Sequence, residues 1–198
     1  MTFSILLAAA ALLSVERAAY LWIWYKPEAF RRCCQRARLK RLGGPVDVLK
    51  ALFVAFKLVQ AAVFLGWCLY FGAGELVATT LYSWPAGAGV LLLALGQLLN
   101  WSVFSLLGKN GVFYGNRFGY DVEWRHEFPF SVFEHPQYAG ALLSIWGFFL
   151  IMRFPHDDWY WLPLLETVYY AIGAYWERDV GEDNEPATSS QTPSQDCR

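Results

Sequence analysis

Apolar segments separated by polar ones run along the chain and predict its helices. Residues 51–72 and 84–107 are each long enough to cross about 30 Å of hydrocarbon as a helix. Residues 139–152 and 159–176 are shorter, and the tight turn at 153–158 between them favours a hairpin of two tilted helices. A single kinked span followed by an interfacial piece is the alternative. The pattern predicts an all-α, polytopic integral membrane protein with four to five hydrophobic helices.

The first apolar stretch, residues 2–25, is interrupted by Glu16 and Arg17. Because ionisable groups are expensive inside lipid, one interpretation is a re-entrant or interfacial first helix, with its aromatic end at the headgroup level. The other is an ordinary span whose charged pair faces neighbouring helices. Lys57, near the start of the next segment, is expected to extend toward the interface without a functional role.

Composition supports a membrane protein. Of 198 residues, 56% are hydrophobic, 17% are charged and 18% are aromatic, with ten tryptophans. A net charge of −1 gives no reason to expect a nucleic-acid partner. Residues 26–50 are strongly basic, which favours anionic headgroups and the cytosolic side. We expect one membrane-embedded domain over residues 1–180 and a disordered polar tail at 181–198.

The candidate chemistry lies in the polar segment 108–140, which holds two of the three histidines, several carboxylates and regularly spaced glycines. If the last two helices form a hairpin, His135, Tyr138 and Glu177 meet at one membrane surface. Carboxylates, an arginine and aromatic faces there suit a cationic, nucleotide-like ligand. The same charges also fit plain solvation of a loop and a helix end. The histidine spacing gives no reason to expect a metal site.

Gly96 and Asn100 lie four residues apart and share one face of the uncharged 84–107 helix. Small residues and amides on such a face are typical of close packing between membrane helices. A notch in which a ligand approaches the backbone is the functional alternative.

Two blocks in the polar segment resemble a known family. The glycines at 108, 111, 115 and 119, with Phe118, resemble the G-x2-G-x3-G-x-x-F-G stretch of phosphatidylethanolamine N-methyltransferases. Residues 128–130 (FPF) and 135–140 (HPQYAG) resemble the FPF…NPxYxG segment of the same family. The resemblance covers about residues 10–180. These relatives are small integral-membrane phospholipid methyltransferases that use S-adenosylmethionine.

The resemblance implies N-methylation of the ethanolamine headgroup of phosphatidylethanolamine, or of its mono- and dimethyl forms, toward phosphatidylcholine. It implies the endoplasmic reticulum membrane, with a mitochondrial membrane as the alternative. The family's two cofactor motifs fall on Ala94–Leu95–Gly96 and on Glu177–Arg178, and Tyr138 and Gly140 are expected to join them. Alanine here replaces a glycine of the first motif, and Arg178 replaces a glutamate and so inverts a charge.

The implied reaction needs a base, because the headgroup amine must lose a proton before it attacks a methyl group. Glu134, His135 and Glu127 are the candidates, and Arg117 or Arg125 is the candidate anchor for the phosphate.

Two other interpretations remain. His135 stands where the phospholipid enzymes have asparagine and is closer to isoprenylcysteine carboxyl methyltransferases, whose activity is one alternative. The charge inversion at Arg178 favours the other, a non-catalytic membrane relative.

Overall fold

The computed structural model describes residues 2–76, 78, 83–123 and 125–182. The described residues form helices and no strands, which confirms the predicted all-α class. The α-helices are α1 (Thr2–Tyr25), α2 (Pro27–Cys34), α3 (Pro45–Phe71), α4 (Trp84–Val112), α5 (Pro136–Met152) and α6 (Trp161–Glu182). Two short 3-10 helices, η1 (Lys40–Leu42) and η2 (Gly115–Phe118), follow α2 and α4.

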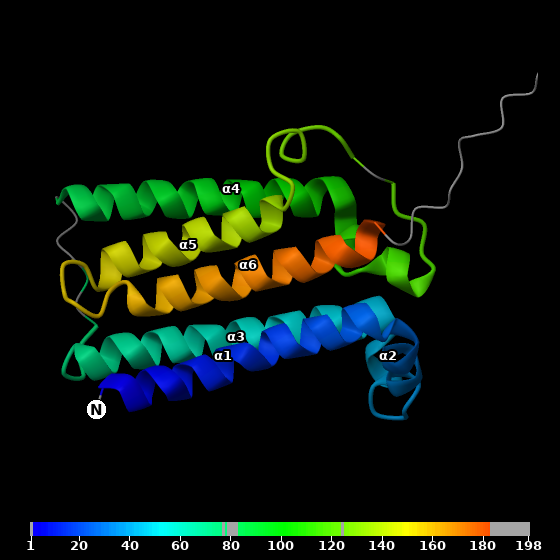
Figure 1. Cartoon of the computed structure of the whole chain (residues 1–198), viewed down its shortest axis with the longest axis horizontal. Helices are drawn as coiled ribbons and strands as arrows, with labels where there is room; N and C mark the ends of the chain where they lie inside the picture. Colours follow the sequence, from blue (N-terminus) through cyan, green and yellow to red (C-terminus); the bar gives the residue numbers. More distant parts are fainter. Residues whose placement is uncertain (1, 77, 79–82, 124, 183–198) are drawn as a thin grey trace, which may run out of the picture.

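Five helices lie side by side along the long axis, with α6 between the α1–α3 pair and the α4–α5 pair (Figure 1). Three of them, α1, α3 and α4, are long and apolar enough to cross a membrane, and α5 is apolar but shorter. α5 and α6 form the expected C-terminal hairpin. As a result, α2, the polar segment after α4 and the end of α6 gather at one end of the bundle.

α1 is one unbroken helix through Glu16 and Arg17 and is long and apolar enough to cross a membrane, as the second interpretation of this segment expects. Each charge meets a partner on a neighbouring helix. Lys57 Nζ of α3 lies 3.1 Å from a Glu16 carboxylate oxygen, and Arg17 Nη2 lies 3.2 Å from Glu166 Oε2 of α6. The expectation that Lys57 extends to the interface is therefore wrong, because the Glu16 carboxylate holds it inside the bundle.

The basic segment stops where the sequence predicts, at Gly43–Gly44–Pro45. Gly43 has a φ of +113°, which side chains rarely adopt. Pro45 occupies the first turn of α3, where its missing N–H costs nothing. The Asp47 carboxylate accepts the Gly44 N–H at 3.0 Å and pairs with Lys109 at 2.7 Å. The start of α3 is thus tied to the end of α4.

α4 and α5 pack backbone against backbone through glycines spaced seven residues apart. A Cβ on Gly96 would meet the Gly140 carbonyl oxygen at 2.5 Å, and one on Gly147 would meet the Gly89 carbonyl oxygen at 2.6 Å. Ser144 also reaches Gly96, so the notch at this glycine is filled by α5. The structure therefore agrees with close packing of small residues rather than with a ligand notch at Gly96.

We expect Gly89→Val to lower the free energy of unfolding in detergent by about 1–3 kcal/mol, because the added atoms overlap α5. Gly87→Val is the matched control on the same helix, since nothing lies within 4 Å of a Cβ at Gly87. Thermal unfolding of both variants measures the difference, and equal midpoints would contradict the packing argument.

A buried ion pair closes the opposite end of the bundle. The Arg153 guanidinium donates to both carboxylate oxygens of Asp158, at 2.8 and 2.7 Å, and to the Phe71 carbonyl at 3.1 Å. Trp67 Nε1 donates to Asp158 at 3.0 Å. The carboxylate raises the pKa of Arg153, which keeps the guanidinium charged. These bonds join the end of α3 to the turn between α5 and α6.

Asp158→Ala should lower the free energy of unfolding by about 3–5 kcal/mol, because it leaves Arg153 charged and buried without its partner. Asp157→Ala removes an exposed carboxylate one residue earlier and should change stability by less than about 0.5 kcal/mol. Chemical or thermal unfolding of the two variants side by side tests the contrast. An Asp158→Ala variant as stable as Asp157→Ala would mean that the pair does not hold this end together.

Candidate active site

A cavity of about 1240 Å³ lies inside the bundle, with walls from all five long helices and from the polar segment after α4. Apolar clusters flank it on both sides. One cluster uses Ile23 and the first turns of α3, and the other uses Ala9, Leu13 and the last turns of α3. Polar side chains thus gather in the stretch of the bundle between two packed cores.

Glu177 is a carboxylate in this cavity that two tyrosine hydroxyls hold in place. Its Oε1 accepts the Tyr138 hydroxyl at 2.6 Å and the Tyr114 hydroxyl at 2.9 Å. The three residues come from α6, α5 and the segment that ends α4. Tyr114 reaches the site because α4 breaks at Gly108, whose φ is +60°, and the backbone at Tyr114 itself has a positive φ of 54°. Two donors on one oxygen fix the position of the Glu177 carboxylate.

Deeper in the bundle, a chain of polar contacts joins α1, α3 and α6. Lys57 pairs with Glu16 at 3.1 Å and donates to Gln60 at 3.0 Å. Gln60 donates to Glu166 at 2.8 Å, and Glu166 pairs with Arg17 at 3.2 Å. Glu16 and Glu166 are buried, so each needs this compensation. Four of the five line the cavity, and Glu166 supports them from behind.

Aromatic rings cover much of the remaining wall. The His135 ring stacks on Tyr138 with centroids 5.4 Å apart, and Tyr138 meets the edge of Tyr170 at 5.1 Å. Trp24 meets Tyr114 at 5.1 Å on the other side. Ring faces attract cations, so this wall suits a positively charged group close to the Glu177 carboxylate. His135 Nε2 is buried and has no hydrogen-bond partner among the described residues.

The structure brings four of the predicted site residues to the cavity, namely Glu134, His135, Tyr138 and Glu177. The third base candidate, Glu127, is exposed on the polar segment and does not line the cavity. The predicted meeting of His135, Tyr138 and Glu177 at one end of the bundle is therefore observed.

The remaining predicted cofactor residues lie elsewhere. Ala94 and Leu95 are exposed on α4, and Gly96 and Gly140 close against each other in the α4–α5 contact. None of the four lines the cavity. The side chain of Arg178 lies outside the described residues, as does most of the tail, residues 183–198.

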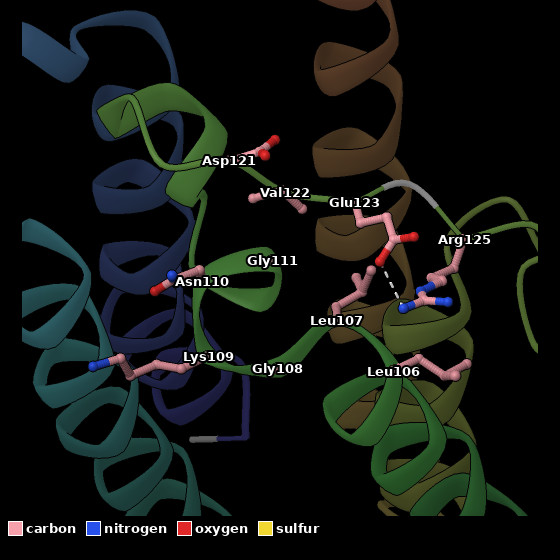
Figure 2. A pocket seen from close by; sticks show the side chains of 10 residues that line it. All are labelled: Leu106, Leu107, Gly108, Lys109, Asn110, Gly111, Asp121, Val122, Glu123 and Arg125. Carbon is pink, nitrogen blue, oxygen red and sulfur yellow. Dashed lines mark hydrogen bonds and ion pairs between the residues drawn. The ribbon is translucent and has the colours of Figure 1, made fainter.

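Of the two arginines expected to anchor phosphate, Arg117 lines the cavity and Arg125 does not. Arg125 borders a separate hollow of about 390 Å³ at the break in α4 and pairs there with Glu123 at 2.7 Å. Figure 2 shows this pair at one side of the hollow, with Lys109 pointing away from it toward Asp47 of α3. Arg117 instead lies with its guanidinium carbon 3.9 Å from the Trp24 ring centre.

Sequence reasoning missed the contribution of α1 and α3. Arg17, Tyr20, Trp24, Lys57 and Gln60 all line the cavity, and none was a predicted site residue. The available signal was charge inside apolar segments, because an ionisable group in a membrane span marks a functional interior by default. Among the described residues no group of three or more histidines, cysteines or acids is arranged to hold a metal ion.

Comparison with known proteins assigns the chain to a class. The family model described as phospholipid methyltransferase matches residues 84–180. The phosphatidyl-N-methylethanolamine N-methyltransferase of Arabidopsis thaliana is 34% identical over 126 residues, which is 64% of this chain and 67% of that protein. The Saccharomyces cerevisiae protein of the same name is 37% identical over 92 residues, 45% of this chain and 43% of its own length. No solved structure matches.

An integral membrane transferase with a polar cavity is the class that the fold and the comparisons define. The chain belongs to the phospholipid methyltransferase family. This confirms the resemblance seen in its glycine-rich and FPF blocks and the expectation that it is an enzyme.

Tyr138→Phe should reduce phospholipid methylation about two- to tenfold, because it removes one of the two hydroxyls that hold Glu177. Tyr114 keeps the other bond, so a moderate loss is expected rather than inactivation. Initial rates in proteoliposomes measure it. Tyr70→Phe, an exposed tyrosine near the other end of α3, is the control. An unchanged rate in Tyr138→Phe would show that the position of Glu177 does not matter.

Proposed function

We propose that the enzyme transfers methyl groups from S-adenosylmethionine to the ethanolamine nitrogen of phosphatidylethanolamine, or of its mono- and dimethyl forms, toward phosphatidylcholine. Both curated relatives are named for phosphatidyl-N-methylethanolamine, which supports the monomethyl lipid as one acceptor. We propose the endoplasmic reticulum membrane as its location, on the same family resemblance.

The observation that carries the proposal is Glu177, held by two tyrosines at one end of a cavity inside a membrane bundle. The headgroup amine is a cation when it is protonated, and the methyl donor carries a positive charge on its sulfur. A fixed carboxylate with ring faces beside it stabilises such groups and orients them. Since methyl transfer depends mainly on alignment of the two reactants, this rigid arrangement is the contribution required of the protein.

The cavity residues fit S-adenosylmethionine, judged by the carboxylate, the aromatic wall and the unpartnered polar atoms along it. When bound, S-adenosylmethionine would supply a methyl group on a positively charged sulfur. Glu177, Tyr114 and Tyr138 would hold the positive end. Arg178 and residues 94–96 are the remaining motif positions, and we propose that they also contact S-adenosylmethionine. Binding of S-adenosylmethionine to an Arg178→Glu variant tests the contact at Arg178.

The nitrogen must be neutral to attack, so a protein group has to accept its proton. His135 supports this role because its Nε2 is buried at the cavity wall with no partner among the described residues. Glu134, beside it on the same wall, is the second candidate base, and the exposed Glu127 is the third. With the proton held on one of these groups, the neutral nitrogen would be able to accept a methyl group from a donor held at Glu177, Tyr114 and Tyr138.

The test is methyl transfer from labelled S-adenosylmethionine in proteoliposomes. Acceptors are phosphatidylethanolamine, its mono- and dimethyl forms, and a prenylcysteine analogue. Glu177→Gln should lower transfer to phospholipid about 10- to 100-fold, because a charged hydrogen-bond partner is worth roughly 1.5–3 kcal/mol. Glu75→Gln, an exposed acid at the opposite end of the bundle, is the control and should match the wild type.

Each outcome is informative. Label in phospholipid that falls in Glu177→Gln and not in Glu75→Gln supports the proposal. Label only in the prenylcysteine analogue would reject it in favour of carboxyl methylation. No label in any acceptor, together with no donor binding, would mean that this chain is a non-catalytic member of the family.

A further inference from the structure

Three buried polar atoms on one face of α1 have no hydrogen-bond partner among the described residues. They are Arg17 Nε, the Tyr20 hydroxyl and Trp24 Nε1. Their positions are three and four residues apart, so the three side chains follow one another along the same side of the helix. All three residues line the large cavity. Trp22 and Tyr25, on other sides of α1, are exposed instead.

Buried polar atoms without hydrogen-bond partners destabilise the folded protein unless a ligand supplies the missing partners. A buried polar atom without a partner costs about 1–3 kcal/mol, and native proteins contain few of them. Here three occur on consecutive turns, and all face the same cavity. Two of the three, the guanidinium and indole N–H groups, can only donate. The missing partner is therefore a group rich in acceptor oxygens.

The charges around the cavity indicate the sign of the charge on that ligand group. Arg17 contributes a guanidinium to the row, whose Nη2 donates to Glu166 and whose carbon lies 3.7 Å from the Tyr170 ring centre. Arg117 adds a second guanidinium, 3.9 Å from the Trp24 ring centre. On the α5–α6 side the fixed group is the Glu177 carboxylate. The Glu16 carboxylate on the α1 side is already paired with Lys57 at 3.1 Å. One wall thus offers unpartnered donors and two guanidinium groups, and the other offers a carboxylate and ring faces.

We infer that the α1 wall, formed by Arg17, Tyr20 and Trp24, is a subsite for the anionic oxygen group of a zwitterionic ligand whose positive end faces Glu177. This inference rests on the proposed function, because both of its substrates are zwitterionic. The lipid headgroup carries a phosphate beside its amine, and the methyl donor carries a carboxylate. The α1 wall lies outside residues 84–180, so the region matched by the family model makes only part of the site.

The test measures binding without turnover. Full-length protein in nanodiscs is titrated separately with a short-chain phosphatidyl-N-methylethanolamine and with S-adenosylmethionine. Tyr20→Phe and Trp24→Phe each remove one unpartnered donor, and Tyr25→Phe and Trp22→Phe remove the same groups from exposed positions on α1. We expect Tyr20→Phe and Trp24→Phe to weaken one of the two ligands about two- to tenfold, and the controls to bind like the wild type.

The two ligands separate the sources of the anion. Weakening confined to the lipid assigns the α1 wall to phosphate, and weakening confined to the donor assigns it to carboxylate. The unfolding temperature of ligand-free Tyr20→Phe should equal or exceed that of the wild type, because the hydroxyl has no partner to lose. A merely structural tyrosine would lower it.

Two results would overturn the inference. One is unchanged affinity for both ligands in Tyr20→Phe and Trp24→Phe, and the other is a wild type that binds neither. The proposed function fails separately, when the wild type binds both ligands and transfers no methyl group.

Discussion

The charges inside the bundle are the constraint on which the rest of the structure depends. Glu16 and Arg17 are neighbours on α1 and therefore point about 100° apart around the helix. An unpaired charge in a buried, low-dielectric setting is strongly unfavourable. α1 must therefore have Lys57 of α3 on one side and Glu166 of α6 on the other. This requirement fixes both the order and the register of three helices, and the cavity walls follow from that register.

The other half of the bundle is held by a different kind of contact. α4 and α5 meet through glycines, so their backbones approach closely. The cavity lies beside this contact, with walls from all five long helices and from the segment after α4. The break at Gly108 matters here, because it bends the chain so that Tyr114 reaches Glu177. Polar pairing thus holds α1, α3 and α6 together, and close packing holds α4 against α5.

Much of this was readable from the sequence. Uninterrupted apolar length predicted α3 and α4, the turn at 153–158 predicted the α5–α6 hairpin, and that hairpin brought His135, Tyr138 and Glu177 together as expected. The sequence could not tell whether a charged side chain within a membrane span points toward the interface or toward another helix. Lys57 near a span end looks the same whether it reaches the interface or a carboxylate on another helix, and only the helix order decides. The sequence also left the role of Gly96 open, because close packing and ligand approach require the same missing side chain.

The positions that carry the family resemblance and the residues that form the cavity overlap only in part, and the reason is physical. Residues 84–180 supply the carboxylate, its tyrosines and the histidine, which suit the positive part of a substrate. A membrane-embedded site must also hold the negative part of that substrate away from water, which requires donors on a facing wall. Arg17, Tyr20 and Trp24 are donors on such a wall, and they lie on a helix whose own charges fix its rotation. The ion pairs of Glu16 and Arg17 therefore have two effects. They lower the cost of charge on α1 in a membrane, and they fix the helix rotation that turns its hydrogen-bond donors toward the cavity.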